Sequence, residues 1–401
     1  MVAPSNEVGL GKHRANRLSY GKWLPNYVWQ KLSRSMPRGR VHLIFALADH
    51  FEPAFMLGNG VAEAVLAEQE RRVEAWCTEY PRAVDAWRDH EGRRFTHTYF
   101  FPAEQYDRGL VDRLAEHCHA GWGEIEIHLH HGIDAPDTAE NTQHMIERFR
   151  DTLVRNHCAL SFMDGSSEPR YAFVHGNFAL ANSADGYACG VDNEMEILAR
   201  TGCYADFSLP TATFHPAQIA KINSLYECGL PLHERAPHRR GTNLRVGRPP
   251  QIFPLQVQGP LMLDFHRHAR NHIGRIENAA LTGVNPPSLR RHELWKKAAI
   301  SVQHRPDWLF IKLHCHSMDP AQRESVMGGH MQKFLSELIG GAQSRDEVIH
   351  FVTAREMVNI ILAACDGREG NPGDYRDYRL KLAGRAPTAQ HDTKSQMSFR
   401  G

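Results

Sequence analysis

The stretch VHLIFALADHFEP at residues 41–53 decides the fold class of this chain. Residues 41–48 are apolar except for His42, and the run ends abruptly at Asp49 and His50. A nearly continuous apolar run of this length is typical of a strand that is buried on both faces, as in a parallel sheet. We therefore expect residues 41–49 to form a central parallel strand with polar side chains at its carboxyl end.

Strand and helix patterns alternate after this run. Aromatic or alternating segments predict strands, and longer amphipathic segments predict helices, the first of which should end at Pro81. Six or seven such units favour one barrel-like α/β domain, and no GxGxxG or GxxxxGK[ST] motif supports a nucleotide-binding fold. The expected strands are 95–101, 124–130, 170–175, 203–207, 308–314 and 347–352, and the expected helices are 61–80, 103–119, 138–156, 192–201, 321–339 and 354–364.

The overall composition excludes several classes of protein. The 401 residues are 42% hydrophobic, and 47 Lys and Arg balance 46 Asp and Glu to a net charge of +1. These values exclude a disordered chain and indicate no nucleic-acid partner. No apolar run reaches the roughly 20 residues that span a bilayer, and no secretory signal is visible. Because the eight cysteines form no CxxC pair, we expect reduced thiols and a cytoplasmic location.

Two basic segments flank or interrupt the alternating pattern. Residues 1–40 contain eight Lys and Arg against one acid, which suggests either a helix packed on the main domain or a peripheral contact with the inner face of an anionic membrane. Residues 233–297 contain 12 Lys and Arg against 4 Asp and Glu, and 252–265 within them predict a β-hairpin bent at Gly259-Pro260. The expected organisation is a basic extension at 1–40, a barrel domain at 41–365 with an insertion at 233–297, and a poorly packed polar tail at 366–401.

Histidine is unusually frequent, with 26 copies, and several predicted strands end in one. In parallel α/β folds the carboxyl ends of the strands meet at one rim, where their loops surround a common pocket. We therefore expect the polar groups of five strand ends to gather there. These groups are Asp49 with His50, His128 with His130 and His131, His175 with Asn177, Asp206, and His314 with His316.

The His128-Leu129-His130 sequence predicts a metal site. Side chains two residues apart on a strand point the same way, so both imidazoles can reach one divalent ion such as Zn²⁺. Asp49, from a neighbouring strand, would complete three protein ligands and leave one position open for water. The alternative is that both histidines lie on a solvated edge of the sheet and bind no metal ion.

Several short motifs in this layout resemble those of the NodB-type polysaccharide deacetylases, carbohydrate esterase family 4 and its relatives. The resemblance covers residues 41–364 in short pieces and implies a distorted (β/α) barrel, here with a long basic insertion containing a β-hairpin. The motifs are LADHFEP at 47–53, TYFFP at 98–102, EIHLH at 126–130, the charge-tuning Asp206 in YADF, KLH at 312–314 with His314 as general acid, and FVTAREM at 351–357.

The first motif can be aligned in two ways. The family opens it with two acids, a general base followed by a metal ligand. If Ala48-Asp49 is the pair, Asp49 binds the metal and the base is lost, whereas if Asp49-His50 is the pair, Asp49 is the base and His50 the ligand. The family's second histidine, four positions after the first, is replaced by Gly132 or Asp134, which leaves Asp134 or His131 beside the site.

The resemblance implies metal-assisted hydrolysis of an acetamide on an amino sugar, within an anionic or lipid-linked glycan. Asp49, Glu52 and Asp134 are the candidates for the base, and His314 as imidazolium would protonate the departing amine. The candidates for contacting substrate are His175, Asn177, Asp206 and His316. Two alternatives stay open: another metal hydrolase of the amidohydrolase or PHP phosphoesterase kind, and a catalytically silent barrel that binds glycan in polysaccharide assembly.

Overall fold

The computed structural model describes residues 19–34, 37, 39–55, 64–211, 215–265 and 275–383. The helices are α1 (Ser19–Ser33), α2 (Leu66–Val84), α3 (Arg108–His117), α4 (Ala139–His157), α5 (Glu194–Thr201), α6 (Leu289–Lys297), α7 (Arg323–Val326), α8 (Gly329–Gly340) and α9 (Ala354–Cys365). The strands are β1 (Val41–His50), β2 (His97–Pro102), β3 (Gly123–Leu129), β4 (Ser161–Met163), β5 (Pro169–His175), β6 (Cys203–Asp206), β7 (Leu225–Cys228), β8 (Gly241–Asn243), β9 (Leu255–Val257), β10 (Met262–Asp264), β11 (Arg275–Glu277), β12 (Trp308–Cys315), β13 (Glu347–Val352) and β14 (Leu380–Leu382).

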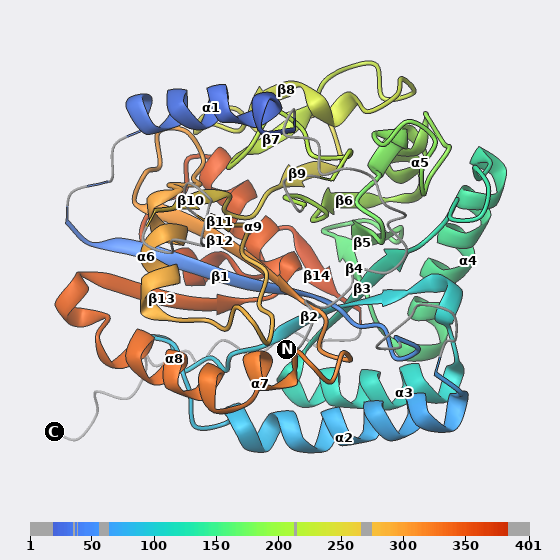
Figure 1. Ribbon diagram of the computed structural model, residues 1–401, viewed down its shortest axis with the longest axis horizontal. Helices are drawn as coiled ribbons and strands as arrows, with labels where there is room; N and C mark the ends of the chain where they lie inside the picture. Colours follow the sequence, from blue (N-terminus) through green and yellow to red (C-terminus); the bar gives the residue numbers. More distant parts are fainter. Residues whose placement is uncertain are drawn as a thin grey trace, which may run out of the picture.

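One large, mostly parallel sheet forms the centre of the molecule (Figure 1). Its strands follow the order β12-β1-β2-β3-β5-β6-β9-β7-β8, and β13 also pairs with β1. The pairs from β12 to β9 are parallel, and only β7 with its two neighbours is antiparallel along this path. The prediction of a parallel α/β sheet is therefore confirmed. Among the described residues no ladder joins the two ends of the sheet.

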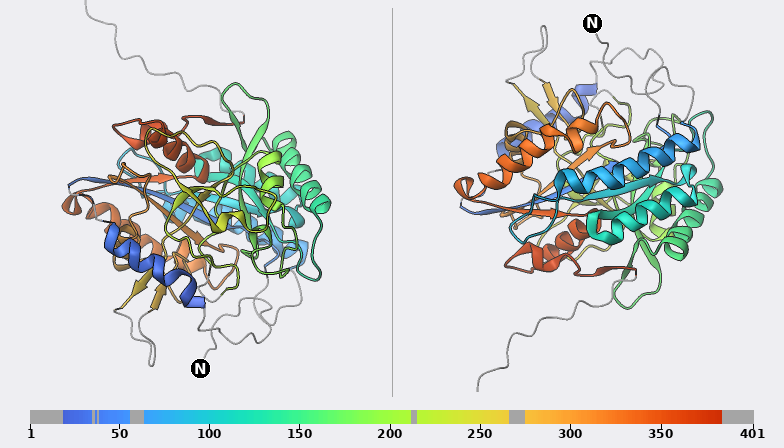
Figure 2. Two further views of the ribbon diagram at one scale, coloured as in Figure 1. Left: turned by 90° about the horizontal axis from the view of Figure 1, so that it is seen from above. Right: turned by 90° about the horizontal axis from the view of Figure 1, so that it is seen from below.

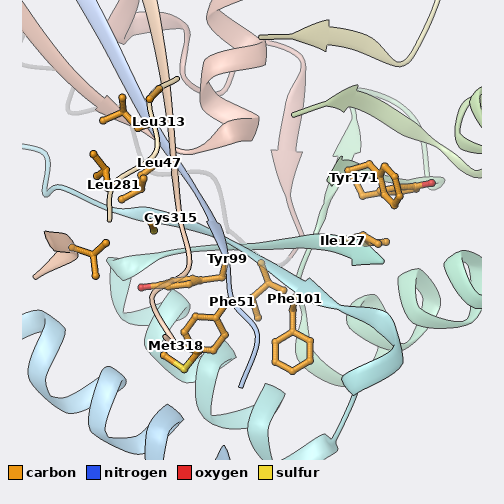
Figure 3. Close-up of a cluster of buried hydrophobic side chains, with 14 of the residues drawn as sticks. Leu47, Phe51, Tyr99, Phe101, Ile127, Tyr171, Leu281, Leu313, Cys315 and Met318 are labelled. Carbon is orange, nitrogen blue, oxygen red and sulfur yellow. The ribbon is translucent and has the colours of Figure 1, made fainter. Parts of the chain in front are cut away.

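The long central strand β1 is buried on both faces, as its apolar run predicted. Its odd-numbered side chains join a first core with α2, α3, α4 and α8, part of which is drawn in Figure 3. Its even-numbered side chains join a second core with α1 and α9 on the opposite face. In Figure 2, α2 and α3 lie side by side along the lower surface of the molecule. Helices packed on both faces therefore bury β1 along almost its whole length.

Most predicted elements are present, with small shifts of their ends. Helix α2 continues through Pro81 to Val84, although we expected it to end there. A proline removes one backbone N–H and disturbs the helix locally. The extra turn is held because Tyr80 and Val84 are both fully buried in the first core.

The hairpin predicted at 252–265 is not formed. Strand β9 pairs with β6 and β7 in the main sheet, whereas β10 pairs with β11. Gly259 lies directly against β12, where a Cβ atom would stand 2.5 Å from the carbonyl oxygen of Lys312. A glycine at this position therefore allows two chain segments to pack closely, and it does not form the tight turn that the sequence predicted.

The polar tail is partly packed, contrary to expectation. Strand β14 pairs with β4, and Leu380 is fully buried. Both backbone polar groups of Leu380 are bonded by the buried amide of Asn359, and Arg376 Nη2 lies 3.0 Å from Asp89 Oδ2. Buried polar partners thus hold this segment although it is poor in apolar residues. Residues 384–401 lie outside the described part of the chain.

Helix α1 packs on the main domain, as one of the two interpretations of the basic extension predicted. Trp23 and Tyr27 are buried in the second core, and Asn26 and Gln30 bond to the backbone carbonyls of Ala220 and Ile222. No helix within the described ranges combines the length and the apolar character that a membrane span needs.

Candidate metal centre

Polar side chains at the carboxyl ends of β1, β3 and β12 share one face of the sheet. In all three strands the odd-numbered apolar side chains belong to the first core, so the even-numbered side chains point to the other face. The even-numbered residues at these ends are histidines and one glutamate. They are His50, Glu52, His128, His130, His314 and His316.

The carboxylate of Glu52 is the centre of this group. Its Oε1 lies 3.1 Å from His128 Nε2, 3.7 Å from His130 Nε2 and 4.0 Å from His316 Nε2. The ligand atoms of Glu52, His128 and His130 lie within 4.8 Å of one another, and those of His50, Glu52 and His316 form a second such triad. Glu52 therefore stands between two pairs of imidazoles.

The hydrogen bond between His128 and the backbone of Val174 determines which ring nitrogen of His128 carries the proton. His128 Nδ1 lies 3.0 Å from the carbonyl oxygen of Val174, which can only accept a hydrogen bond. Nδ1 therefore carries the proton of the neutral ring, and the Nε2 lone pair points at the Glu52 oxygen. Two acceptors only 3.1 Å apart require a proton or a cation between them.

His130 is oriented by a second carboxylate. Its Nδ1 lies 2.6 Å from Glu104 Oε1, which leaves Nε2 directed toward Glu52. Metal-binding histidines commonly donate their other ring N–H to a carboxylate or a carbonyl group. His128 and His130 show one example of each.

Burial and mutual contact shift the pKa values of these groups. Burial raises the pKa of Glu52, but the contacts with His128, His130 and His316 outweigh it, so that its pKa falls to about 2. Burial lowers the pKa of His130, yet Glu104 and Glu52 raise it overall to about 9. Burial and the neighbouring imidazoles hold the pKa of His50 well below its ordinary value. Glu52 is therefore an ionised carboxylate that lies among several imidazole rings.

The site is buried on one side and open on the other. His50 and His128 have almost no exposed surface, whereas the side chains of His130 and His316 are 18% and 28% exposed. A small molecule can thus approach from the side of these two rings.

Asp49 does not belong to this centre, which corrects the ligand set expected from the sequence. As an odd-numbered residue of β1, it faces the first core. Its Oδ2 lies 2.9 Å from His97 Nδ1, and its Oδ1 accepts the Ser317 N–H at 2.9 Å. Glu52 therefore takes the position that the sequence analysis assigned to Asp49.

His131 and Asp134 are also separate from the centre. His131 points to the opposite side of the sheet, where its Nε2 lies 3.1 Å from Glu194 Oε1. Asp134 is exposed in the turn that follows β3. The structure therefore brings together His50, Glu52, His128, His130 and His316, and leaves Asp49, His131 and Asp134 out.

The other predicted substrate contacts lie in different surroundings. His175 is fully buried beside Glu194, and the backbone N–H of Asn177 donates to its Nδ1. Asp206 accepts hydrogen bonds from Ser208, and burial raises its pKa to about 7. Among the four predicted substrate contacts, His316 lies beside the centre, with its Nε2 4.0 Å from Glu52 Oε1.

His314 lies on the face of the centre, next to His50. The two ring centroids are 6.2 Å apart, and Nδ1 of His314 is buried with no hydrogen-bond partner among the described residues. Burial, Lys312 and His316 hold its pKa well below the ordinary value. His314 is therefore neutral near pH 7 and not the imidazolium that the sequence analysis expected.

Sequence reasoning missed Glu104 and His97. Glu104 lies two residues after the end of β2, so an acidic residue near a strand end was an available signal. His97 lies at the start of β2, where no strand-end argument applies, and only the pairing of Leu47 with His97 brings it near Asp49. The sequence matches no protein-family model, and no curated protein is detectably similar to it.

Proposed function

We propose that the protein is a divalent-metal-dependent hydrolase whose ion, zinc, is held by Glu52, His128 and His130. The observation that carries the proposal is the lone pair of His128 Nε2 facing the Glu52 carboxylate at 3.1 Å, with His130 Nε2 beside it. One carboxylate and two imidazoles are the ligand set of several catalytic zinc sites, which keep a fourth position open. The exposed edges of His130 and His316 supply that opening.

The proposed reaction is the N-deacetylation of an amino sugar, in a glycan or its lipid-linked precursor. Its support is the resemblance of the strand-end motifs to NodB-type deacetylases, together with a mainly parallel sheet that is compatible with a barrel of that type. A bound zinc ion polarises the carbonyl group and lowers the pKa of an attacking water molecule.

The chain's own residues would manage binding and proton transfer. His316 is the most exposed of these rings and would contact the sugar. Asp49 lies on the other face and Glu52 is assigned to the ion, so neither takes the base role that the family gives to a carboxylate. Neutral His314, whose Nδ1 has no partner among the described residues, would accept the proton of the water and return it to the leaving nitrogen.

The test combines metal analysis with two activity assays on the purified chain. We expect zinc to co-purify, and the protein to release acetate from N-acetylated chito-oligosaccharides. His128→Ala and His130→Ala should lose this zinc and the acetate release, while the exposed His119→Ala should lose neither.

Each other outcome contradicts part of the proposal. Zinc content that does not change in His128→Ala and His130→Ala would overturn the metal site. Phosphate release from sugar phosphates, without acetate release, would favour the phosphoesterase alternative. Zinc without either activity would favour a silent glycan-binding protein.

A further inference from the structure

A second group of metal-ligating side chains lies on the opposite face of the sheet. It consists of His131 after β3, His175 at the end of β5, Cys189 in the loop that follows, and Glu194 at the start of α5; we call it the Cys189 cluster. One ligand atom from each residue lies within 4.8 Å of the others, and all four residues are buried. The strand residue His175 has the odd parity of the first core, of which Cys189 is itself a member.

His131 points Nε2 into this cluster. Its Nδ1 lies 3.0 Å from Asp137 Oδ2, and Thr142 Oγ1 donates to the same carboxylate oxygen. Because an ionised carboxylate only accepts, Nδ1 carries a proton toward Asp137, and Nε2 carries one toward Glu194 Oε1 at 3.1 Å. A bound metal ion would take the place of the proton on Nε2. The carboxylate–histidine arrangement is typical of metal ligands.

Cys189 both accepts and donates hydrogen bonds. Its Sγ receives the backbone N–H groups of Asn182 at 3.3 Å and Val191 at 3.5 Å, and its thiol donates to Glu194 Oε2 at 3.6 Å. A metal ion at the site would displace the thiol proton, and the two N–H groups would then face a thiolate. A thiolate is the soft ligand that selects zinc over magnesium or calcium.

His175 completes the group. Its Nε2 is fully buried, lies 3.9 Å from Glu194 Oε1 and has no hydrogen-bond partner among the described residues. Its Nδ1 accepts the Asn177 N–H at 3.2 Å, which places the proton of the neutral ring on Nε2. Binding of a metal ion at Nε2 would move this proton to Nδ1. Nδ1 could then no longer accept the hydrogen bond from the Asn177 N–H.

We propose that His131, His175, Cys189 and Glu194 bind a structural zinc ion. Structural zinc sites are closed and four-coordinate, often with cysteine among the ligands, whereas catalytic sites keep an open position. The Cys189 cluster is closed on all sides, in contrast to the centre at Glu52. The inference does not depend on the proposed function.

The site would hold an irregular loop in place. Between β5 and α5, the five non-glycine residues Phe178, Ala181, Asn182, Asp185 and Ala188 have φ between 46° and 60°. Such left-handed residues persist only where their surroundings hold them. The loop also approaches the turn after β3 so closely that a Cβ on Gly132 would stand 2.0 Å from the Cys189 carbonyl oxygen. A metal that links His131 to Cys189 would fasten these two segments together.

The experiment measures zinc stoichiometry and cobalt spectra of the full-length protein. We expect one zinc equivalent that is lost in Cys189→Ser and retained in His130→Ala. Cobalt bound in its place should show sulfur-to-metal charge-transfer absorption, which Cys189→Ser removes and His130→Ala preserves. The buried Cys203→Ser is the matched control and should leave both readouts unchanged.

The result that overturns the inference is wild-type protein whose cobalt form shows no thiolate absorption, or absorption that persists in Cys189→Ser. If Cys189→Ser fails to fold, the wild-type cobalt spectrum still decides the question. If only the proposed function is wrong, the cobalt spectrum should still show a thiolate-bound ion. The zinc that depends on His128 and His130 would then be absent.

A different observation carries a second inference, about helix α1. Its inner side chains are buried, but Leu24, Val28 and Leu32 follow one another at four-residue spacing on the outer side and are 37%, 49% and 80% exposed. Trp29 is 68% exposed beside them. Together these four side chains form a continuous apolar stripe, which we call the α1 stripe.

The geometry points to an anionic lipid surface as the partner of the α1 stripe. Lys31 follows Val28 by three residues and so borders the stripe, and residues 1–40 contain eight basic residues and one acid. Interfacial helices combine an apolar face with flanking lysines, and Trp prefers the headgroup region. A protein partner of the apolar stripe would not explain this excess of positive charge.

The test is co-sedimentation with vesicles of phosphatidylcholine, with and without phosphatidylglycerol. We expect the full-length protein to bind the anionic vesicles at low salt, and Trp29→Glu/Leu32→Glu to weaken binding at least about tenfold. The exposed Leu230→Glu is the matched control and should bind like the wild type. Absence of binding by the wild-type protein would overturn the inference. A wild-type dimer that is lost in Trp29→Glu/Leu32→Glu but kept in Leu230→Glu would also overturn it, because the stripe would then bind a second copy of the chain.

Discussion

Nε2 of His128 and Oε1 of Glu52 lie 3.1 Å apart, and the proton of the neutral His128 ring is on the opposite nitrogen, bonded to Val174. The pair therefore presents two lone pairs to the same point. Glu52 comes two residues after the end of β1 and His128 is in β3, so the contact depends on strand β2, which lies between them in the sheet.

The first prediction compares the two glutamates around His130. Glu104→Gln should weaken zinc binding about 10- to 100-fold, which is typical of the loss of a partner behind a metal-binding histidine. Glu52→Gln removes a ligand and should weaken it further. Competition with a chromophoric zinc chelator measures both affinities. Equal affinities in the wild type and Glu52→Gln would contradict the ligand assignment.

The second prediction concerns Gly176, which lies against the ring of His130. A Cβ atom at this position would stand 2.2 Å from His130 Cδ2, so Gly176→Ala must displace the ring. We expect zinc affinity to fall at least about tenfold, as when other supports of a ligand are lost. Gly340→Ala, where a Cβ atom meets no atom beyond its own helix backbone within 4 Å, is the control. A Gly176→Ala protein with normal zinc affinity would show that the ring can shift without cost.

The third prediction separates Asp49 from the metal centre. Asp49→Asn should keep its zinc, because the carboxylate faces the first core and bonds with His97 and Ser317. It should lower the free energy of unfolding by about 1–3 kcal/mol, the cost of weakening a buried charged hydrogen bond. Denaturant unfolding and metal analysis of the same sample check both statements. Loss of zinc with unchanged stability would restore Asp49 as a ligand.

The fourth prediction concerns the acid dependence of stability through Glu347. This buried carboxylate bonds with His292, Lys296 and Arg345. Burial raises its pKa, but these partners outweigh burial and lower it from 4.5 to about 2. A carboxyl group whose pKa is lower in the folded protein than in the unfolded chain stabilises the folded protein at pH values above the unfolded-chain pKa. This stabilisation is lost as the pH falls toward the pKa of the folded protein.

Glu347→Gln should therefore be less stable than the wild type near neutral pH, by about 1–3 kcal/mol. The difference between the two proteins should shrink as the pH falls from about 5 to about 3. Urea unfolding at several pH values measures this difference. A difference that stays constant with pH would show that Glu347 is not ionised in the folded protein.

Local sequence patterns predicted most of the secondary structure and part of the metal centre. The pair His128 and His130 was recognisable because alternation along a strand is a local property. The choice between Asp49 and His50 was not, because it depends on which face of β1 matches the histidine face of β3. That match follows from the pairing of both strands with β2, which no periodicity within β1 reveals.

The Cys189 cluster shows the same limit more strongly. Cys189 lies in an irregular loop with several residues of positive φ, so neither helical nor strand spacing relates it to Glu194 or His131. Gly259 is a second example. Its sequence context predicted a turn, but the glycine is needed because the chain there packs closely against β12.

By itself, the sequence determined most of the strands and helices and the polar groups at the strand ends, since both follow from the spacing of side chains along a single segment. Only the tertiary structure decided that Glu52, and not Asp49, meets the histidines, and that His131 turns to the other side of the sheet. The physical reason is that sidedness between strands depends on register and on the paths of loops, which are set by contacts between residues far apart in the chain.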